Sequence, residues 1–269
     1  MSKDAVFDRR ILFMSSIAPT IGIHVAESKR ARRTALAALL ALALPWLSGC
    51  ESGARVKDTS RTFRTVVIDA GHGGHDTGAR ARSGAQEKHA ALDTALRLDP
   101  MLRAAGFETV LTRKGDYFIP LGQRARISNR QENAIFVSIH YNHAKNRSAR
   151  GVETFYKSKP SRKIAERIQN HITMLPGVIS RGVKTANFFV LRKNEYPAVL
   201  VEGGFFSNPS EAARCASPAY REAVASAIAT AIITHRGPLE PAPAPAATPD
   251  PNLAPVPTPL AVSPSPTIR

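Results

Sequence analysis

Short runs of apolar, largely β-branched residues recur through the middle of the chain and constrain its fold more than any other feature. They occupy residues 66–69, 107–111, 134–139, 152–156 and 198–201. Strands that are apolar at nearly every position are typical of sheets buried on both faces. Helical patterns lie between them, at residues 87–105, 123–131, 161–173 and 220–234. The alternation predicts an α/β fold, a single three-layer α/β/α domain whose mostly parallel, twisted sheet has about six strands and helices on both faces.

The first 50 residues have the order of features found in a bacterial lipoprotein signal. A basic run at residues 29–33 precedes an apolar run at residues 35–46, which is too short to span a bilayer. Leu-Ser-Gly-Cys at residues 47–50 then resembles the lipobox, in which the cysteine is acylated and becomes the mature N-terminus. We therefore expect residues 1–49 to be a signal peptide and Cys50 to carry the lipid. An ordinary secretory signal followed by a chance cysteine is the alternative.

The rest of the chain divides into a linker, a domain and a tail. Residues 50–61 are expected to be a short linker after the acylated cysteine, and residues 62–236 the folded domain. Residues 237–269 contain 11 of the chain's 20 prolines. Because proline has no backbone donor, this segment is expected to be a disordered tail. The anchor predicts a membrane-tethered lipoprotein of the cell envelope that faces the periplasm. We expect the outer membrane to hold the lipid, and the sequence leaves the choice of membrane open.

The chain is strongly basic, which raises the question of nucleic-acid binding. It has 37 Lys and Arg residues against 21 Asp and Glu residues, a formal net charge of +16. The basic residues are scattered, no recognition motif is present, and export would remove the chain from nucleic acid. We therefore expect no nucleic-acid partner, and the charge points to the anionic envelope. With only two cysteines, the sequence also excludes a disulfide-dense scaffold or a cysteine-based zinc cluster.

Residues that bind metals or transfer protons follow three of the predicted strands. His72 follows the first strand, His140 the third and Glu202 the last, and Glu87 begins the first long helix. Ligands of an open α/β sheet gather at the carboxyl ends of its strands. A single histidine is usually packed or solvated, and the helix dipole alone favours a glutamate in a first turn. A carboxylate directly after an apolar strand is costly without a partner, however. Two histidines and two glutamates could supply three zinc ligands, an open position for water and a base.

Six ordered segments of the chain resemble the zinc-dependent N-acetylmuramoyl-L-alanine amidases that cleave bacterial cell walls. They are residues 68–79 (IDAGHGGHDTGA), 86–88 (QEK), 111–116 (LTRKGD), 138–142 (SIHYN), 197–209 (PAVLVEGGFFSNP) and Glu211. The resemblance covers most of residues 66–233. Two positions depart from the family's usual pattern: Ala70 stands where a proline is usual, and Ala91 where an asparagine is usual.

The resemblance implies a metal site, a reaction and a substrate. His72, Glu87 and His140 are the implied ligands of a zinc ion (Zn²⁺), and Glu202 is the implied catalytic carboxylate. The implied substrate is peptidoglycan, in which a zinc-activated water hydrolyses the amide between N-acetylmuramic acid and L-alanine, with Glu202 as general base and then acid. Only 61 residues separate His140 from Glu202. This leaves little room for the inhibitory helix of some family members, so we expect an open site.

Several other residues are candidates for substrate contact. His75, Asn142 and His143 lie near the implied ligands. Arg113 could hold a carboxylate of the stem peptide, although an ion pair with Asp116 is equally consistent with the sequence. Cys215 is expected to be a free, buried thiol.

Two other functions stay open at this stage. One is a wall-binding lipoprotein that has lost catalysis, and the other is a zinc peptidase acting on cell-wall peptides. We expect a monomer, and the sequence leaves open whether an activator protein is needed.

Overall fold

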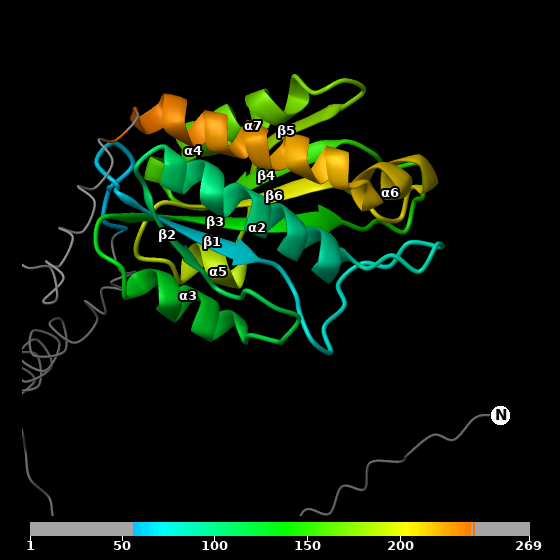
Figure 1. Ribbon diagram of the computed structural model, residues 1–269, viewed down its shortest axis with the longest axis horizontal. Helices are drawn as coiled ribbons and strands as arrows, with labels where there is room; N and C mark the ends of the chain where they lie inside the picture. The colour runs from blue at the N-terminus through cyan, green and yellow to red at the C-terminus, as the bar shows by residue number, and fades with distance from the viewer. Residues whose placement is uncertain (1–55, 238, 240–269) are drawn as a thin grey trace, which may run out of the picture. The chain divides into compact units, whose positions relative to one another are not determined.

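The computed structural model of the protein describes residues 56–237 and 239 (Figure 1). The predicted signal peptide, Cys50 and most of the proline-rich tail lie outside the described residues. None of the described helices combines the length and the apolar character that a membrane span requires.

The part of the predicted linker that the structure describes packs against the domain. The amide of Lys57 donates to the carbonyl of Glu195 at 2.7 Å, and the hydroxyl of Thr59 donates to the carbonyl of Ala134 at 2.5 Å. The described domain therefore begins several residues before the expected boundary at residue 62.

A six-stranded sheet forms the centre of the domain, in the order β2-β1-β3-β6-β4-β5. Strands β1, β2, β3 and β6 run parallel to one another; β4 is antiparallel to β6 and parallel to the edge strand β5. The prediction of a mostly parallel sheet of about six strands is confirmed. The strands are β1 (Thr65–Ala70), β2 (Glu108–Leu111), β3 (Ala134–Asn142), β4 (Val152–Tyr156), β5 (Ser180–Thr185) and β6 (Ala198–Phe205).

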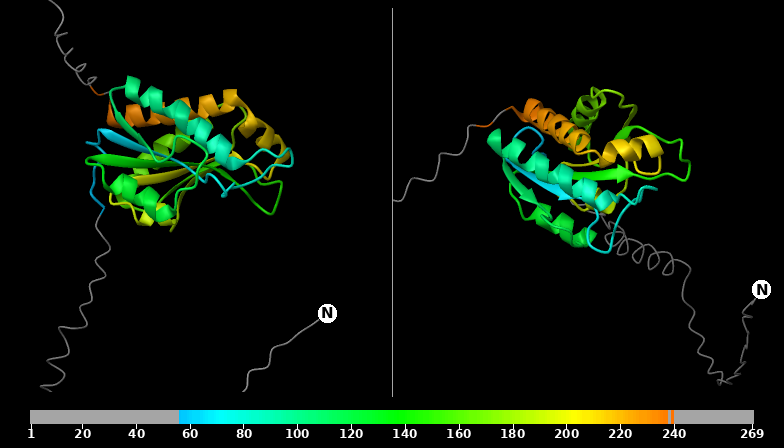
Figure 2. Two further views of the ribbon diagram at one scale, coloured as in Figure 1. Left: turned by 60° about the horizontal axis from the view of Figure 1, so that its bottom comes forward. Right: turned by 45° about the vertical axis from the view of Figure 1, so that its right-hand side comes forward.

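Helices cover both faces of the sheet, which confirms the three layers (Figures 1 and 2). On one face α2 (Glu87–Ala104), α4 (Arg162–Thr173) and α7 (Pro218–Arg236) enclose the larger hydrophobic core. On the other face lie α3 (Leu121–Asn129) and the short α5 (Phe189–Arg192). The short helices η2 (Lys159–Ser161) and α6 (Pro209–Ala216) precede α4 and follow β6.

Side chains of one strand alternate between the two cores because successive residues of a strand point to opposite faces. In β1, Val66 and Ile68 belong to the larger core, and Val67 between them belongs to the smaller one. All six residues of β1 are buried. This double burial explains why the strand is apolar at nearly every position.

The parallel register brings the carboxyl ends of the three central strands to one edge of the sheet. Ala70 of β1 pairs with Ile139 of β3, and His140 of β3 pairs with Glu202 of β6. Residues that follow or end these strands therefore lie together, as the order of strands and polar residues predicts.

Candidate metal centre and cavity

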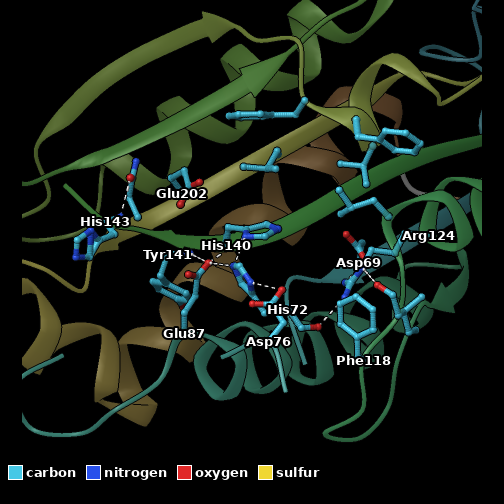
Figure 3. A pocket seen from close by; sticks show the side chains of 17 residues that line it. Asp69, His72, Asp76, Glu87, Phe118, Arg124, His140, Tyr141, His143 and Glu202 are labelled. Atoms are coloured by element: carbon cyan, nitrogen blue, oxygen red, sulfur yellow. Dashed lines mark hydrogen bonds and ion pairs between the residues drawn. The ribbon is translucent and has the colours of Figure 1, made fainter. Parts of the chain in front are cut away.

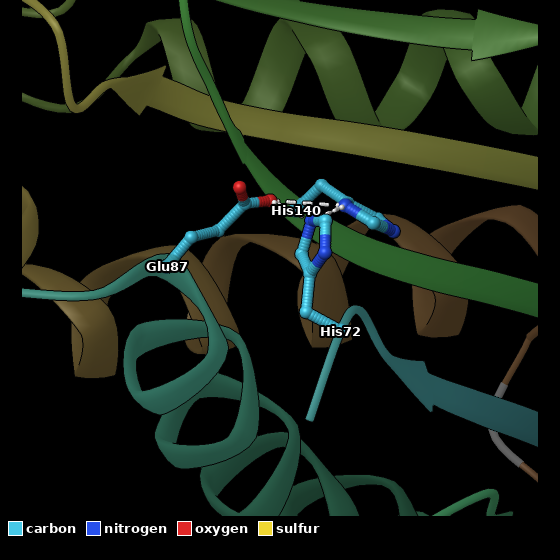
Figure 4. Close-up of side chains that lie close together, drawn as sticks. All are labelled: His72, Glu87 and His140. Atoms are coloured by element: carbon cyan, nitrogen blue, oxygen red, sulfur yellow. Dashed lines mark hydrogen bonds and ion pairs between the residues drawn. The ribbon is translucent and has the colours of Figure 1, made fainter. Parts of the chain in front are cut away.

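His72, Glu87 and His140 form a compact cluster at the carboxyl edge of the sheet (Figure 4). His72 lies in the loop after β1, Glu87 is the first residue of α2, and His140 lies in β3. Oε1 of Glu87 is 2.9 Å from Nε2 of His72 and 3.0 Å from Nδ1 of His140. One potential ligand atom from each residue lies within 4.8 Å of the other two. Two imidazoles and one carboxylate at this spacing can bind a single metal ion.

Neighbouring groups orient the cluster in the manner of a metal site. Oδ2 of Asp76 is 2.8 Å from Nδ1 of His72, which leaves Nε2 directed at the cluster. Glu87 accepts hydrogen bonds from the amide of Ala79 at 2.8 Å and the amide of Tyr141 at 3.0 Å. A carboxylate on the second nitrogen of a ligand histidine fixes the tautomer that binds a metal. The donor set and its support therefore fit zinc, which prefers nitrogen and oxygen ligands of these types.

The cluster also sets the charge state of its own members. Burial alone would raise the pKa of Glu87, but hydrogen bonds from His140 and His72 and their positive charge outweigh it and hold the pKa well below its ordinary value. Burial opposes protonation of His72, yet Glu87 and Asp76 raise its pKa. The site is thus an anionic carboxylate held between imidazoles, an environment that attracts a cation.

Two glycines leave the space that this cluster occupies. A Cβ on Gly78 would lie 2.5 Å from Oε2 of Glu87 and 2.6 Å from Cδ2 of His72. Gly78 also has a backbone φ of 62°, which disfavours other residues. A Cβ on Gly71 would lie 2.4 Å from Cε1 of His140. The GHGGHDTG segment is therefore needed for close approach of the backbone to the ligand side chains.

Glu202 lies beside the cluster without belonging to it (Figure 3). Its register partner in β3 is His140, and it lines the same cavity as the three ligand candidates. Its Oε2 atom is buried and has no hydrogen-bond partner among the described residues. Burial, followed by the negative charges of Glu87 and Glu153, raises the pKa of Glu202 well above its ordinary value. An unpaired carboxyl group with a raised pKa is suited to exchange a proton with a bound substrate.

These residues line a cavity of about 580 Å³ that has an apolar side. Figure 3 shows His143 and Phe118 at opposite ends, with His72, His140 and Glu202 between them. Much of the lining is hydrophobic, and part of it is open to solvent. The exposed fractions are 41% for Phe118, 53% for Leu121 and 41% for Phe188.

A buried ion pair beneath the cavity fixes the loop that carries His72. Nη1 of Arg124 donates to Oδ1 of Asp69 at 2.8 Å, and both side chains are almost fully buried. Arg124 also donates to the carbonyls of Ala70 and His72, each at 2.6 Å. Burial would raise the pKa of Asp69, but Arg124 and hydrogen bonds from Ser138 and Thr112 hold it below its ordinary value. Residue types and spacing did not point to Arg124, because it belongs to a distant helix.

The other expected contact residues differ in how they meet the cavity. Asn142 lines the cavity, and its side-chain Nδ2 donates to Oε1 of Glu153 at 2.6 Å. His143 also lines it. His75 is exposed, packs on the ring of Phe118 with centroids 4.3 Å apart, and is not among the lining residues.

Arg113 does not take either of the roles expected for it. Its side chain is fully buried, and it donates to the backbone carbonyls of four residues: Ala70, Gly71, Lys88 and Gly115. Asp116 pairs with Lys88 at 2.6 Å instead of with Arg113. Arg113 therefore joins the loop after β1 to the start of α2, and it is not available to a stem-peptide carboxylate.

Asp76 and Glu153 are functional candidates that the sequence did not single out. Asp76 lies four residues after His72 and orients it. Glu153 is a charged residue inside an otherwise uncharged strand, a signal that could have marked it.

Residues 66–234 match the protein family described as N-acetylmuramoyl-L-alanine amidase. LytC of Bacillus subtilis, named as such an amidase, is 38% identical over 61% of this chain, which spans about a third (34%) of LytC. AmiA of Escherichia coli, also named as such an amidase, is 32% identical over 64% of the chain and 76% of AmiA. Among solved structures, the amidase AmiC2 of Nostoc punctiforme has a TM-score of 0.61 at 38% identity, covering 64% of this chain and 96% of that one.

Proposed function

Because this chain belongs to the N-acetylmuramoyl-L-alanine amidase family, we propose that it hydrolyses the amide bond between N-acetylmuramic acid and the L-alanine of peptidoglycan stem peptides. The observation that carries the proposal is the placement of Glu202. Glu202 lines the same cavity as the His72, Glu87 and His140 cluster, and its buried Oε2 atom has no hydrogen-bond partner among the described residues. A metal site beside a proton-transfer group is the arrangement that amide hydrolysis requires.

His72, Glu87 and His140 are the residues that would hold a zinc ion. Bound zinc lowers the pKa of a coordinated water and polarises a carbonyl group. Asp76 keeps the ring of His72 oriented, and the amides of Ala79 and Tyr141 hold the carboxylate of Glu87. Asp76 and these two backbone amides thus orient the side chains that would bind the metal.

Glu202 is proposed to transfer the protons. As the carboxylate it accepts a proton from the attacking water while the carbon–oxygen bond forms at the scissile carbonyl. As the acid it returns that proton to the amide nitrogen when the carbon–nitrogen bond breaks, so the products are a free lactyl carboxylate and the amino group of L-alanine. The raised pKa of Glu202 favours the return step.

The predicted export and anchoring place this activity where peptidoglycan lies. We propose that Cys50 is acylated and tethers the domain to a membrane, the outer membrane in our proposal, so that it faces the periplasm. The basic run, apolar run and lipobox-like residues 47–50 support this. Mass spectrometry of the mature N-terminus tests it: a diacylated or triacylated Cys50 is expected, and an unmodified N-terminus elsewhere would contradict it.

Analysis of digestion products tests the reaction. Purified peptidoglycan incubated with the zinc-loaded enzyme should release intact stem peptides that begin with L-alanine, and glycan strands with free lactyl groups. Shortened stem peptides would instead identify a peptidase, and cleaved glycosidic bonds a glycosidase. Zinc binding without any product would identify a protein that binds the wall without catalysis.

A further inference from the structure

A second cavity adjoins the catalytic one at its His143 end. It measures about 330 Å³, and His143 lines both cavities. We call its basic lining the cationic pocket, and its four members are Arg80, Arg82, Lys145 and Arg147.

The cationic pocket is built by the loop that carries His72 and by the loop that follows β3, the strand that carries His140. Arg80 and Arg82 lie between His72 and Glu87, in the segment that joins β1 to α2. Lys145 and Arg147 follow β3, shortly after His140. A substrate that reaches the His72, Glu87 and His140 cluster therefore passes beside these four side chains if it leaves the cavity past His143.

The described residues do not neutralise the positive charge of the pocket. In the described part of the chain, no carboxylate lies within 4 Å of the charged atoms of these four residues. By contrast, nearby cations such as Lys88 and Arg181 pair with Asp116 and Glu153. All four members of the cationic pocket are exposed. Four unpaired cations around one hollow produce a positive potential that attracts anionic ligands.

Two hydrogen bonds hold part of the pocket in place. Nε of Arg147 donates to the carbonyl of Ser207 at 3.2 Å, and Nε of Arg80 donates to the hydroxyl of Thr77 at 3.3 Å. These bonds leave the terminal guanidinium nitrogens for a ligand. Guanidinium groups bind carboxylates through two parallel hydrogen bonds, which gives both affinity and direction.

The opposite end of the catalytic cavity has different chemistry. Phe118 lies there, across the His72, Glu87 and His140 cluster from His143 (Figure 3), and further apolar side chains line the same cavity. The two ends of the site thus differ in charge. A substrate with one neutral and one anionic end would bind in only one direction.

On the basis of the proposed function, we infer that the cationic pocket binds free carboxylates of the stem peptide. The peptide then leaves the scissile amide past His143, and the neutral glycan lies toward Phe118. This is the role that Arg113 cannot perform, because its side chain is fully buried. The pocket makes the enzyme select stems by their charge.

A double variant and two substrates test the inference. The double variant Arg82→Gln, Lys145→Gln removes two charges from the pocket. It leaves Glu202 and the His72, Glu87 and His140 cluster unchanged. The matched control, Lys159→Gln with Lys163→Gln, removes two exposed cations that line other hollows. The substrates are a synthetic muropeptide with free stem carboxylates and the same muropeptide with those carboxylates amidated.

On the free substrate, the pocket variant should lose about tenfold or more in kcat/KM, the scale of one charged hydrogen bond. On the amidated substrate, wild type and pocket variant should have equal, low kcat/KM values, and the control should match wild type on both. An equal loss on both substrates, or no loss, would overturn the inference.

A binding measurement separates this inference from the proposed function. The free stem peptide, which has no scissile amide, should bind the zinc-loaded wild type in a calorimetric titration and bind the pocket variant about tenfold more weakly. This result is expected even if neither substrate is hydrolysed, an outcome that would refute the proposed function alone. If inorganic phosphate displaces the peptide at equal concentration, the pocket is a general anion site and the inference is wrong.

Discussion

Glu153 and Glu202 are directly paired across the antiparallel strands β4 and β6, yet their carboxyl groups have opposite surroundings. Glu153 accepts from Arg181 at 3.0 Å and pairs with Lys184. Burial would raise the pKa of Glu153, but these partners hold it below its ordinary value. Glu202 has one oxygen with no partner among the described residues, and burial raises its pKa. The divergent pKa values of these two adjacent carboxyl groups support the proposal that Glu202 exchanges protons while Glu153 stays ionised.

Replacing Glu202 tests its role in proton transfer. The Glu202→Gln variant should still fold and still bind zinc. Its kcat/KM should fall at least about a hundredfold, the lower range for loss of a general acid–base group. Atomic absorption measures the zinc content of the variant, and circular dichroism measures its folding. Glu222→Gln, on the surface, is the control. An undiminished rate would remove Glu202 from the mechanism, and loss of zinc would make it a ligand.

Two replacements of Glu153 test whether it positions Asn142. Glu153→Ala removes the acceptor of the Asn142 amide, so we expect kcat/KM to fall about tenfold, as for other supporting contacts of a metal site. Glu153→Gln keeps an acceptor oxygen and should retain most of the activity. Glu195→Ala, which breaks the exposed pair with Lys57, is the control. Equal losses in Glu153→Ala and Glu153→Gln would show that the charge matters and the hydrogen bond does not.

Gly78 should be necessary for metal affinity, and Gly84 provides a matched comparison. A Cβ at Gly78 would meet the ligand side chains, whereas a Cβ at Gly84 has no atom within 4 Å. Both glycines have positive φ, so both alanine variants carry a similar backbone cost of about 1–2 kcal/mol. Gly78→Ala alone should weaken zinc binding by about tenfold or more in a competitive chelator titration. Equal zinc affinities in the two variants would contradict the assigned ligand geometry.

The Asp69–Arg124 pair should govern stability at acidic pH. Asp69→Asn leaves a buried guanidinium without its carboxylate, so the free energy of unfolding should fall by about 3–5 kcal/mol. The control Glu166→Gln breaks an exposed pair with Arg162 and should cost less than about 1 kcal/mol. Denaturant unfolding of the metal-free proteins at pH 7 measures both.

The pH dependence of this pair follows from the lowered pKa of Asp69. Its unfolded value is the ordinary 3.8 and its folded value is lower. Ionised Asp69 therefore contributes its full stability above pH 3.8, and this contribution is lost as the pH falls through the folded pKa. The stability difference between wild type and Asp69→Asn should shrink on acidification below that pH. A difference that stays constant down to pH 2 would contradict the assignment.

Much of the fold was predictable because the burial of a strand requires apolar residues within that strand's own sequence. The central strands are buried on both faces, so their apolar runs are visible in the sequence. The edge strand β5, Ser180–Thr185, is largely exposed and polar, and no apolar run marks it. The short helix α6, Pro209–Ala216, begins at a cap in which Asn208 accepts from two backbone amides, a local contact that periodicity does not reveal.

The sequence by itself determined the layers, the direction of the central strands and the approach of His72, His140 and Glu202. Parallel strands end at one edge, so residues that follow them must lie together. Only the tertiary structure decided which partner each long charged side chain selects. Arg113 is directed into the domain, Arg124 reaches Asp69 from a distant helix, and the cationic pocket has no carboxylate partner among the described residues. These choices depend on which distant groups lie within hydrogen-bond distance after folding, and spacing along the chain does not specify that distance.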